Sequence, residues 1–230
     1  MIISITAQKG GVGKTTLASN LAQLLDGRIN PKTKERYKVA IVDADPQGTL
    51  SLWLKDRKEN NPENTIEIIE FNIIDDVLKK ADVLNEIFDF VIIDTPPSVN
   101  NSIGKIIAVS DICVIPTKIG AGDLRAVSST LALMNDKRFC FVISEASGQN
   151  LLEEAIRITS NKAPLLSIIP SKVVYKEAMA LGQGVSERKR YEPSLSQLNN
   201  LIDFILGNPA VHLTLENYKL PFSKSEKIAA

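Results

Sequence analysis

The stretch from Gln8 to Thr16, "QKGGVGKTT", follows directly on the apolar run "MIISITA" and leads into a segment with helical periodicity. Its glycines let the backbone turn tightly and point N–H groups inward at the start of a helix, where an anion is favoured. The order of strand, glycine-rich loop, Lys-Thr pair and helix is typical of a phosphate-binding loop. The usual pattern G-x-x-x-x-G-K-[ST] nevertheless fails at its first position, which is Gln8, and Lys9 is an additional lysine.

In such a loop, Lys14 supplies a positive charge to the β- and γ-phosphates of a nucleotide, and the Thr15 hydroxyl ligates Mg²⁺. The alternative is a glycine turn before an ordinary helix. That alternative does not need a Lys-Thr pair directly after the last glycine, with a strand on one side and a helix on the other. The stretch therefore predicts a nucleotide-binding site that includes Gly10, Gly11, Val12, Gly13, Lys14, Thr15 and Thr16.

Composition predicts one soluble globular domain, because 230 residues with 44% hydrophobic and 23% charged side chains can bury a sizeable core. The 27 basic and 27 acidic residues cancel, so binding to nucleic acid or lipid has to come from a local patch. Cys113 and Cys140 lie in apolar runs and are interpreted as reduced core thiols, which fits a reducing cytoplasm. No signal peptide is recognisable, and no apolar run approaches the roughly 20 residues that span a bilayer.

Short runs rich in Ile and Val alternate with longer segments of helical period. Strands are expected at Ile2–Thr6, Lys38–Val42, Thr65–Ile69, Phe90–Asp94, Ile112–Pro116, Phe139–Ser144 and Leu165–Ile169. Helices are expected near Thr15–Leu25, Ile74–Leu84, Leu124–Met134, Leu151–Thr159, Tyr175–Leu181 and Ser194–Leu206. This alternation predicts an α/β fold with a doubly wound, mainly parallel sheet and helices on both faces. We assign residues 1–206 to this domain and residues 207–230 to a peripheral C-terminal tail.

Two acidic motifs follow expected strands, and the carboxyl ends of parallel strands are where such sheets bind ligands. Asp43 and Asp45, in "DADPQ", follow a buried strand, and burying their charges costs free energy unless a cation or a water network binds them. Asp43 is placed to act on the water shell of a metal, and Asp45 to orient or deprotonate an attacking water. Asp94, in "VIIDTPP", ends a hydrophobic strand and is placed to hold Mg²⁺. Each motif alone is also compatible with an ordinary turn, but their conjunction predicts a nucleotide hydrolase of the P-loop type.

The sequence resembles the ParA/MinD superfamily of deviant Walker ATPases, and most closely the small ParA-type partition proteins. The resemblance is carried by "KGGVGKTT", "DADPQG", "VIIDTPP", "VIPTK" and "IIPSKVVYKEAMALGQGVSE", which span most of the chain up to about Leu206. The resemblance implies that Lys9 reaches across a nucleotide-sandwich homodimer to the phosphates bound by the other subunit. It also implies that Asp123 contacts nucleotide or partner, and that Pro170 borders the adenine.

The resemblance favours ATP as the nucleotide. GTPases of this class usually carry an N-K-x-D motif, and the nearest match, at residues 161–164, lacks the aspartate. Many relatives have an asparagine after the strand that matches "CFVIS", where this chain has Ser144 and Glu145, so the base contact there departs from the pattern. The expected cofactors are therefore ATP and Mg²⁺, and the expected reaction is hydrolysis to ADP and phosphate.

Relatives place DNA contacts that do not depend on sequence in the carboxyl-terminal region. Between Ser171 and Arg190 the basic residues outnumber the acidic ones by three, and the candidate DNA contacts are Lys172, Arg188, Lys189 and Arg190. An ordinary solvated helix end is the alternative for "ERKRYE". A second basic segment, Gly27–Lys38, is expected to protrude opposite the nucleotide, and we favour a solvated loop there over an auxiliary DNA contact.

By resemblance, the chain is a cytoplasmic ATPase that dimerises on ATP, associates with the nucleoid and is stimulated by a centromere-binding ParB-like adaptor. The process is segregation of a plasmid or chromosome, and no membrane partner is expected. An alternative is a MinD-like positioning switch, which requires a basic amphipathic terminal helix. Val211, Leu215, Tyr218 and Phe222 fall at helical spacing, but Pro221 interrupts them. An iron–sulfur ATPase is disfavoured because both cysteines lie in expected core strands.

Overall fold

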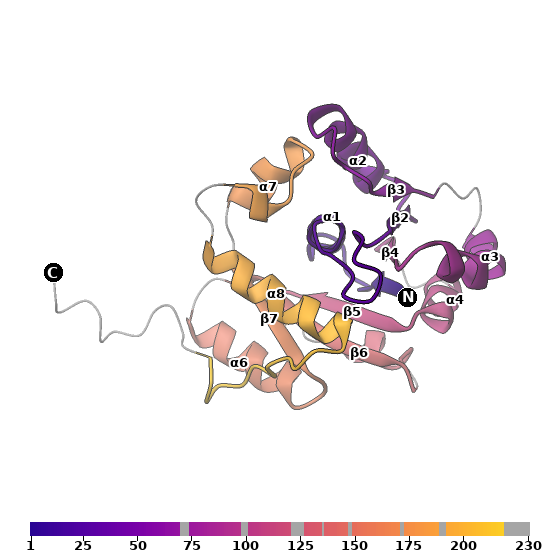
Figure 1. Ribbon diagram of the computed structural model, residues 1–230. Coiled ribbons are helices and arrows are strands. Elements are labelled where there is room, and N and C mark those ends of the chain that lie inside the picture. Colours follow the sequence, from indigo (N-terminus) through magenta and orange to yellow (C-terminus); the bar gives the residue numbers. More distant parts are fainter. Residues whose placement is uncertain are drawn as a thin grey trace, which may run out of the picture.

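The computed structural model describes residues 1–69, 74–97, 101–120, 127–134, 136–146, 149–170, 173–188 and 192–218. In this part of the chain, a seven-stranded sheet carries helices on both faces (Figure 1). The strands are β1 (Ile2–Ile5), β2 (Val39–Asp43), β3 (Glu67–Ile68), β4 (Phe90–Asp94), β5 (Ile112–Thr117), β6 (Arg138–Ala146) and β7 (Leu165–Pro170). The helices are α1 (Lys14–Asp26), α2 (Thr49–Asn60), α3 (Ile74–Ile87), α4 (Asn101–Val109), α6 (Gln149–Ser160), α7 (Val173–Ala180), the short 3₁₀ helix η1 (Val185–Glu187) and α8 (Glu192–Leu206).

The strand order is β3-β2-β4-β1-β5-β6-β7, and every neighbouring pair is parallel. β1 lies between β4 and β5, so the chain builds the sheet first on one side of β1 and then on the other. The central strands are buried on both faces, which explains their nearly continuous apolar sequences. The doubly wound parallel fold predicted from the sequence is confirmed.

Two groups of helices sandwich the sheet. α1, α2, α7 and α8 pack on one face, and α3, α4 and α6 pack on the other. Successive residues of β1 alternate between the two cores, with Ile3 and Ile5 in the first and Ile2 in the second. Cys113 and Cys140 are free, buried thiols, as predicted, and burial raises the pKa of both.

The seven expected strands are all present, and their ends lie within two residues of the expected positions. Five of the six expected helices are present, and the sixth, Leu124–Met134, is helical at residues 127–131 and lies partly outside the described residues. Among the described helices, the α-helices α2 and α4 and the short 3₁₀ helix η1 were not predicted. The two α-helices cover the sheet close to the acidic motifs, since α2 follows Gly48 and α4 follows the segment after Pro97.

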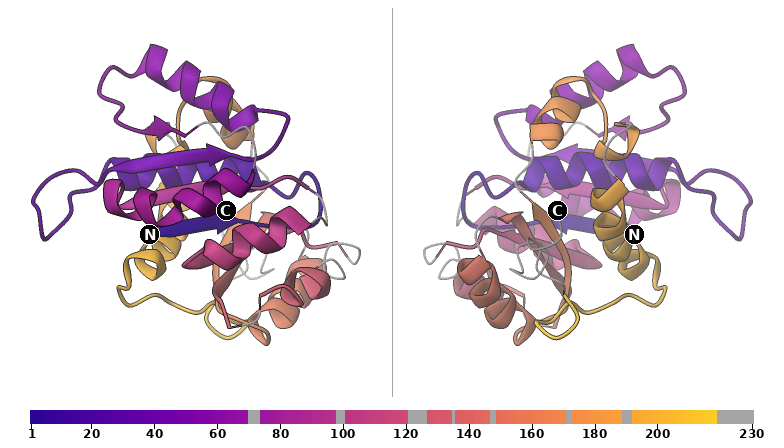
Figure 2. Two further views of the ribbon diagram at one scale, coloured as in Figure 1. Left: turned by 90° about the vertical axis from the view of Figure 1, so that its right-hand side faces the viewer. Right: turned by 90° about the vertical axis from the view of Figure 1, so that its left-hand side faces the viewer.

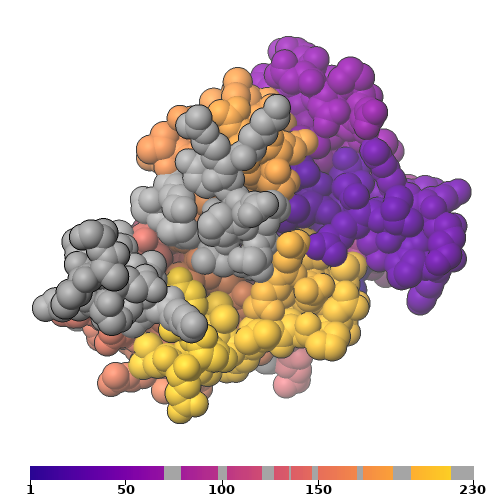
Figure 3. Space-filling view, turned by 60° about the vertical axis from the view of Figure 1, so that its left-hand side comes forward, coloured from indigo at the N-terminus to yellow at the C-terminus, as the bar shows by residue number. Residues whose placement is uncertain are grey.

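Residues 207–218 follow α8 and return along β7. The backbone N–H of Leu213 donates to the carbonyl of Leu165 at 2.7 Å. The side-chain amide of Asn200 accepts the backbone N–H of Val211 at 2.7 Å and donates to the Val211 carbonyl at 2.8 Å. Leu213 and Tyr218 pack on the core between the sheet and α6, and Figure 3 shows this yellow segment lying against the body of the molecule. No helix of the described residues is both long and apolar enough to cross a bilayer.

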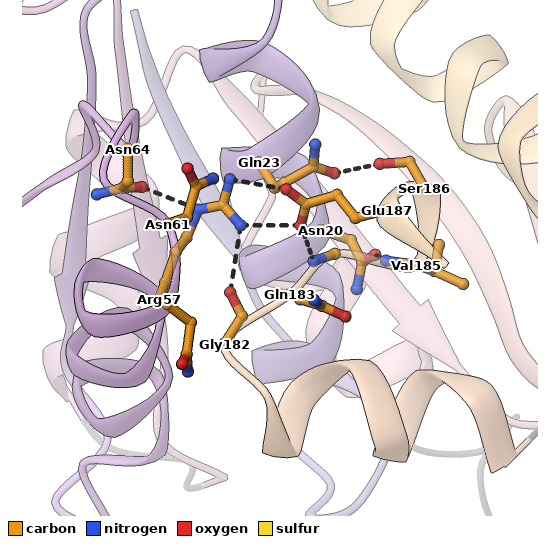
Figure 4. A network of polar contacts seen from close by, with 12 residues as sticks. Asn20, Gln23, Arg57, Asn61, Asn64, Gly182, Gln183, Val185, Ser186 and Glu187 are labelled. Atoms are coloured by element: carbon orange, nitrogen blue, oxygen red, sulfur yellow. Dashed lines mark hydrogen bonds and ion pairs between the residues drawn. The ribbon is translucent and has the colours of Figure 1, made fainter. Parts of the chain in front are cut away.

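A buried arginine and its neighbours connect residues 182–187 to helices α1 and α2 (Figure 4). Arg57 on α2 is only 3% exposed, and its guanidinium donates to both carboxylate oxygens of Glu187 at 2.9 and 3.2 Å. It also donates to the carbonyl of Gly182 and to the side chain of Asn64. On α1, Asn20 accepts the backbone N–H of η1 at 2.8 Å. These bonds fix residues 182–187, which follow α7.

We expect replacement of Arg57 by alanine to lower the free energy of unfolding by about 3 kcal/mol, because it leaves the half-buried carboxylate of Glu187 without its bidentate partner. The neighbouring Lys58 is exposed, so Lys58→Ala is the matched control and should change stability by less than about 0.5 kcal/mol. Urea unfolding without nucleotide measures both variants. Equal effects of the two substitutions would show that the contacts of Arg57 do not stabilise the fold.

Candidate functional site

The glycine-rich stretch forms the turn between β1 and α1, at the carboxyl end of the central strand (Figure 2). Gly11 and Gly13 have φ angles of 69° and 86°, in the left-handed region that favours glycine. Gly13 is the N-cap residue of α1, so the helix begins at Lys14 and its first N–H groups have no partner within the helix. The predicted phosphate-binding geometry of loop and helix N-terminus is therefore present.

Lys14 points its charge back into this loop. The side chain is only 6% exposed, and its ammonium donates to the carbonyl of Lys9 at 3.4 Å. Burial lowers the pKa of Lys14, while the negative charges of Asp94 and Asp45 act in the opposite direction. Lys9 itself lies on the exposed outer turn of the loop. The two lysines thus occupy different places. Lys14 lies inside the concave side of the glycine-rich loop, the phosphate cradle, and Lys9 lies on the outer edge of the loop, its rim.

The carboxylate of Asp94 ends β4 beside the start of α1. The Thr15 hydroxyl donates to Asp94 Oδ2 at 2.6 Å. Asp94 is fully buried, and its other oxygen, Oδ1, has no hydrogen-bond partner among the described residues. Asp43 pairs in register with Asp94 on the adjacent strand β2, so a second carboxylate lies nearby. A hydroxyl and carboxylates, one with a buried unsatisfied oxygen, form an oxygen-rich donor set that fits Mg²⁺.

Burial raises the pKa of Asp94 from 3.8 to about 7, and the negative charge of Asp43 adds to this effect. The hydrogen bond from Thr15 and the charge of Lys14 oppose it. Because the pKa is higher in the folded than in the unfolded chain, the contribution of Asp94 to stability is complete below about pH 3.8 and is lost as the pH rises to about 7. The isolated chain therefore holds an energetically costly carboxylate at neutral pH.

We expect Asp94→Asn to stabilise the chain at pH 8, without metal or nucleotide, by about 2–4 kcal/mol, because the amide carries no charge to desolvate. Near pH 4 the two proteins should be about equally stable, since wild-type Asp94 is then protonated when folded. Urea unfolding at the two pH values measures the difference. A variant that is no more stable than wild type at pH 8 would contradict the raised pKa. Asp203→Asn, on α8, controls for the loss of one negative charge.

The first acidic motif forms the turn between β2 and α2. Ser51, in the first turn of α2, donates to Asp43 Oδ2 from its backbone N–H at 2.8 Å and from its hydroxyl at 3.0 Å. Asp45 is half-buried, and its carboxylate accepts the N–H of Gln47 at 3.0 Å. Asp43 is therefore fixed by α2, whereas Asp45 sits on the turn itself. This placement suits the two roles predicted for them, one toward a metal and one toward water.

A cavity of about 180 Å³ continues from the phosphate cradle and is large enough for part of a nucleoside. It begins at Gly13 and Thr16 and is closed by residues from the ends of β6 and β7 and from α7 and α8. Ser144 donates its hydroxyl to the carbonyl of Val12 at 2.6 Å, which ties β6 to the loop. Glu145, at the cavity, has a φ of 51° and is ion-paired with Lys118 at 2.7 Å.

The structure brings together most of the predicted site but not all of it. Asp123, Lys172, Lys189 and Arg190 lie outside the described residues, and of Pro170 only its place at the end of β7 is described. Arg188 is described, and its guanidinium is ion-paired with Glu177 at 3.7 Å. The carboxylate of Glu177 therefore partly offsets the positive charge that Arg188 was predicted to offer to DNA. The contacts of Ser51 and Ser144 were not predicted. Ser51 bonds Asp43, eight positions earlier, across the turn between β2 and α2, and Ser144 bonds Val12, 132 positions away, so both depend on how the chain folds rather than on a motif.

The sequence profile of the CobQ/CobB/MinD/ParA nucleotide binding domain matches residues 3–185. The carboxysome distribution protein A of Halothiobacillus neapolitanus is 24% identical over 216 residues, covering 89% of this chain and 95% of the relative. The chromosome-partitioning ATPase Soj of Thermus thermophilus is 24% identical over 244 residues, with coverages of 89% and 95%.

Solved structures of the same kind share the fold. MinD from Aquifex aeolicus superposes with a TM-score of 0.72 at 18% identity, covering 92% of this chain and 99% of that one. An ATP complex of McdA from Cyanothece also gives a TM-score of 0.72, at 19% identity and with coverages of 91% and 97%. At such identities the likeness establishes the fold, and the profile match over most of the chain establishes the family.

Proposed function

We propose that this chain, which belongs to the CobQ/CobB/MinD/ParA nucleotide-binding family and is an ATPase of the ParA/MinD type, is a magnesium-dependent partition ATPase. In this proposal it dimerises around ATP, binds DNA without sequence preference as the dimer, and returns to the monomer after slow hydrolysis. The observation that carries the proposal is the contact of Thr15 with Asp94, beside Lys14, where a buried carboxylate oxygen lacks a partner.

The residues have distinct roles in hydrolysis. Lys14 neutralises charge on the terminal phosphates from inside the cradle. Asp94, Asp43 and the Thr15 hydroxyl would hold Mg²⁺, which when bound neutralises the phosphate oxygens. Asp45 orients the attacking water and takes its proton. The position of Asp45 on a turn supports this role, because among the described residues its carboxylate accepts a hydrogen bond only from the backbone N–H of Gln47.

Lys9 is the residue that couples nucleotide to assembly in this proposal. It lies on the rim of the loop rather than inside the cradle, which suits a lysine that reaches the phosphates of a partner subunit. A second ammonium beside phosphate charge in a desolvated interface stabilises both the dimer and the transition state. The base lies in the cavity next to Ser144 and Glu145, and ATP is the proposed nucleotide.

The relatives support a proposal for the cargo and the partner. The names of two relatives concern chromosome partition and carboxysome distribution, which favours the movement or positioning of a large cargo. We place this chain with the DNA-partition branch, with a ParB-like centromere-binding adaptor that stimulates hydrolysis. The ATP-bound dimer is then associated with the nucleoid in the cytoplasm. Asp123, Lys172, Lys189 and Arg190 keep their proposed roles toward nucleotide or DNA.

A membrane-associated positioning switch is the weaker candidate. It requires an amphipathic terminal helix, and Val211, Leu215 and Tyr218 have helical spacing in the sequence. Residues 208–218 do not form the helix that this candidate requires, because they form turns and irregular chain against β7. Tyr218 packs toward the core, so these apolar residues do not make one exposed face.

Binding to random-sequence duplex DNA tests the proposal, measured with ATP, with ADP and without nucleotide across a salt series. Binding that requires ATP, weakens with salt and is stronger in Asp45→Ala is the expected result. Asp56→Ala, which removes a partly exposed carboxylate from α2, is the matched control and should behave like wild type. Dimerisation without DNA binding in any nucleotide state would contradict the DNA-partition proposal, and binding to anionic vesicles would then favour the membrane candidate.

A further inference from the structure

Residues 27–38, between α1 and β2, form a strongly basic hairpin. They contain five basic side chains, Arg28, Lys32, Lys34, Arg36 and Lys38, and one acidic side chain, Glu35. The excess of four positive charges contrasts with the whole chain, in which acidic and basic residues are equal in number. A local excess of this size is the kind of patch through which a neutral protein can bind a polyanion.

The hairpin has a defined structure, although the sequence favoured a simple solvated loop. Ile29 and Arg36 form an antiparallel bridge, and the N–H of Asn30 donates to the carbonyl of Glu35 at 2.8 Å. The Asn30 side chain accepts the N–H of Lys32 at 2.9 Å. Lys34 occupies the turn with a φ of 64°. The basic side chains therefore project from a hydrogen-bonded turn rather than from an irregular loop.

The base of the hairpin is anchored to the sheet. Asp89, next to β4, accepts the N–H of Lys38 at 2.8 Å and a hydrogen bond from the Asn30 side chain. The ring of Tyr37 is buried edge-on against Phe90, with centroids 4.9 Å apart. Arg28 donates to the side chain of Asn199 on α8 at 2.7 Å. Binding through this surface would therefore cost little additional ordering of the backbone.

The lysines at the tip are available to a partner. Lys32 and Lys34 are exposed, and neither is ion-paired with any residue that the structure describes. Arg36 is half-exposed and is ion-paired with the well-exposed Glu63 at 3.5 Å, an interaction that competing phosphates can replace. Desolvating these side chains against phosphate therefore breaks no strong contact within the chain.

Figure 2 shows the hairpin projecting from the end of the sheet opposite the phosphate-binding loop. It joins the carboxyl end of α1 to the amino end of β2, whereas the nucleotide site lies at the carboxyl ends of the strands. In Figure 3 it forms the indigo lobe at the right-hand edge. A ligand there would not compete with nucleotide, and a change of charge there leaves the residues of the nucleotide site untouched.

We propose that residues 27–38 are a docking surface for the phosphate backbone of duplex DNA, an inference that rests on the proposed DNA-partition function and locates one of its contacts. Phosphates require only exposed cations at a fixed spacing, and the lysines and arginines of the hairpin supply them. A bilayer would in addition require an apolar face to insert, whereas Ile29 is the exposed large aliphatic side chain of the hairpin and no aromatic residue is exposed in it.

The test compares two charge-matched double variants of the full chain. Lys32→Gln with Lys34→Gln removes both tip charges, and glutamine meets the same backbone strain as lysine at position 34. Lys58→Gln with Lys162→Gln removes two exposed charges from α2 and from the turn after α6. The measurement is the Kd for random-sequence duplex DNA with ATP from about 50 to 300 mM salt. ATP binding by each variant checks that its nucleotide site is intact.

The hairpin variant should weaken DNA binding about tenfold or more near 100 mM salt and reduce the slope of log K against log salt by roughly two. The control pair should leave the slope unchanged. Equal behaviour of the two variants, with wild-type DNA binding intact, overturns the hairpin inference and leaves the proposed function standing. Absence of DNA binding by wild type overturns both. Loss of anionic-vesicle binding in the hairpin variant, with DNA binding retained, assigns the surface to membranes and overturns the inference.

Discussion

Replacement of Lys14 by alanine is expected to reduce ATP affinity by a few hundredfold. The Lys14 ammonium lies inside the cradle, is almost fully buried, and is attracted by Asp94 and Asp45. Hydrogen bonds from an ammonium to two phosphates contribute about 3–4 kcal/mol, which corresponds to this change in Kd. Without the lysine, the phosphates would also meet two carboxylates with no buried cation between them. Isothermal titration with a non-hydrolysable ATP analogue measures the loss.

The control for this prediction is Lys58→Ala, which removes an exposed ammonium from α2 and should bind the analogue as wild type does. Urea unfolding of Lys14→Ala separates loss of affinity from loss of fold. If the variant remains folded and binds the analogue within about threefold of wild type, the phosphate role of Lys14 is wrong. The glycine loop would then be a structural turn, which was the alternative interpretation of the sequence.

The second large effect is expected for Asp45→Ala, which should lower the single-turnover rate of ATP hydrolysis by about 10²- to 10⁴-fold, the usual contribution of a general base. Nucleotide binding should be retained, because the phosphates are held by the loop and by Lys14. The ATP-bound state therefore accumulates. Rapid-quench measurement of ADP formation with enzyme in excess over ATP isolates this step from product release.

Asp45→Asn separates base catalysis from the shape of the turn. The asparagine oxygen can still accept the N–H of Gln47, which the wild-type carboxylate binds at 3.0 Å, but it cannot take a proton from water. Both variants should be equally slow if Asp45 is the base. An asparagine variant that hydrolyses ATP at the wild-type rate would show that Asp45 maintains the turn between β2 and α2 and has no part in proton transfer.

The strands and the three motifs were predictable from the sequence because their signals are local. Runs such as "FVII" are apolar throughout, since β4 is covered on both faces, and Asp94 and Asp43 are the last residues of their strands. α2 was missed for a physical reason. Its buried face includes Arg57, while Leu52 on the same helix is 62% exposed, so the apolar period that identifies a helix is blurred.

Contacts between distant segments could not be predicted. The bond from Ser144 to Val12 joins residues 132 positions apart, and the ion pair between Arg57 and Glu187 joins residues 130 positions apart. The order of the basic hairpin depends on Asp89, which lies 51 positions beyond Lys38. Each of these contacts follows from the packing of the sheet and its helices. The sequence accordingly predicted which residues carry charge at the site, but not which neighbours hold them in place.

The most direct test of the account is the molecular mass in solution of Asp45→Ala, with and without Lys9→Ala, in the presence of ATP or ADP. Sedimentation velocity should show a dimer for Asp45→Ala with ATP and a monomer with ADP. The double variant should stay monomeric with ATP while binding it about as tightly, because Lys9 lies on the rim of the loop and Lys14 fills the cradle. A double variant that dimerises on ATP as fully as the single variant would contradict the role of Lys9 across the subunit interface.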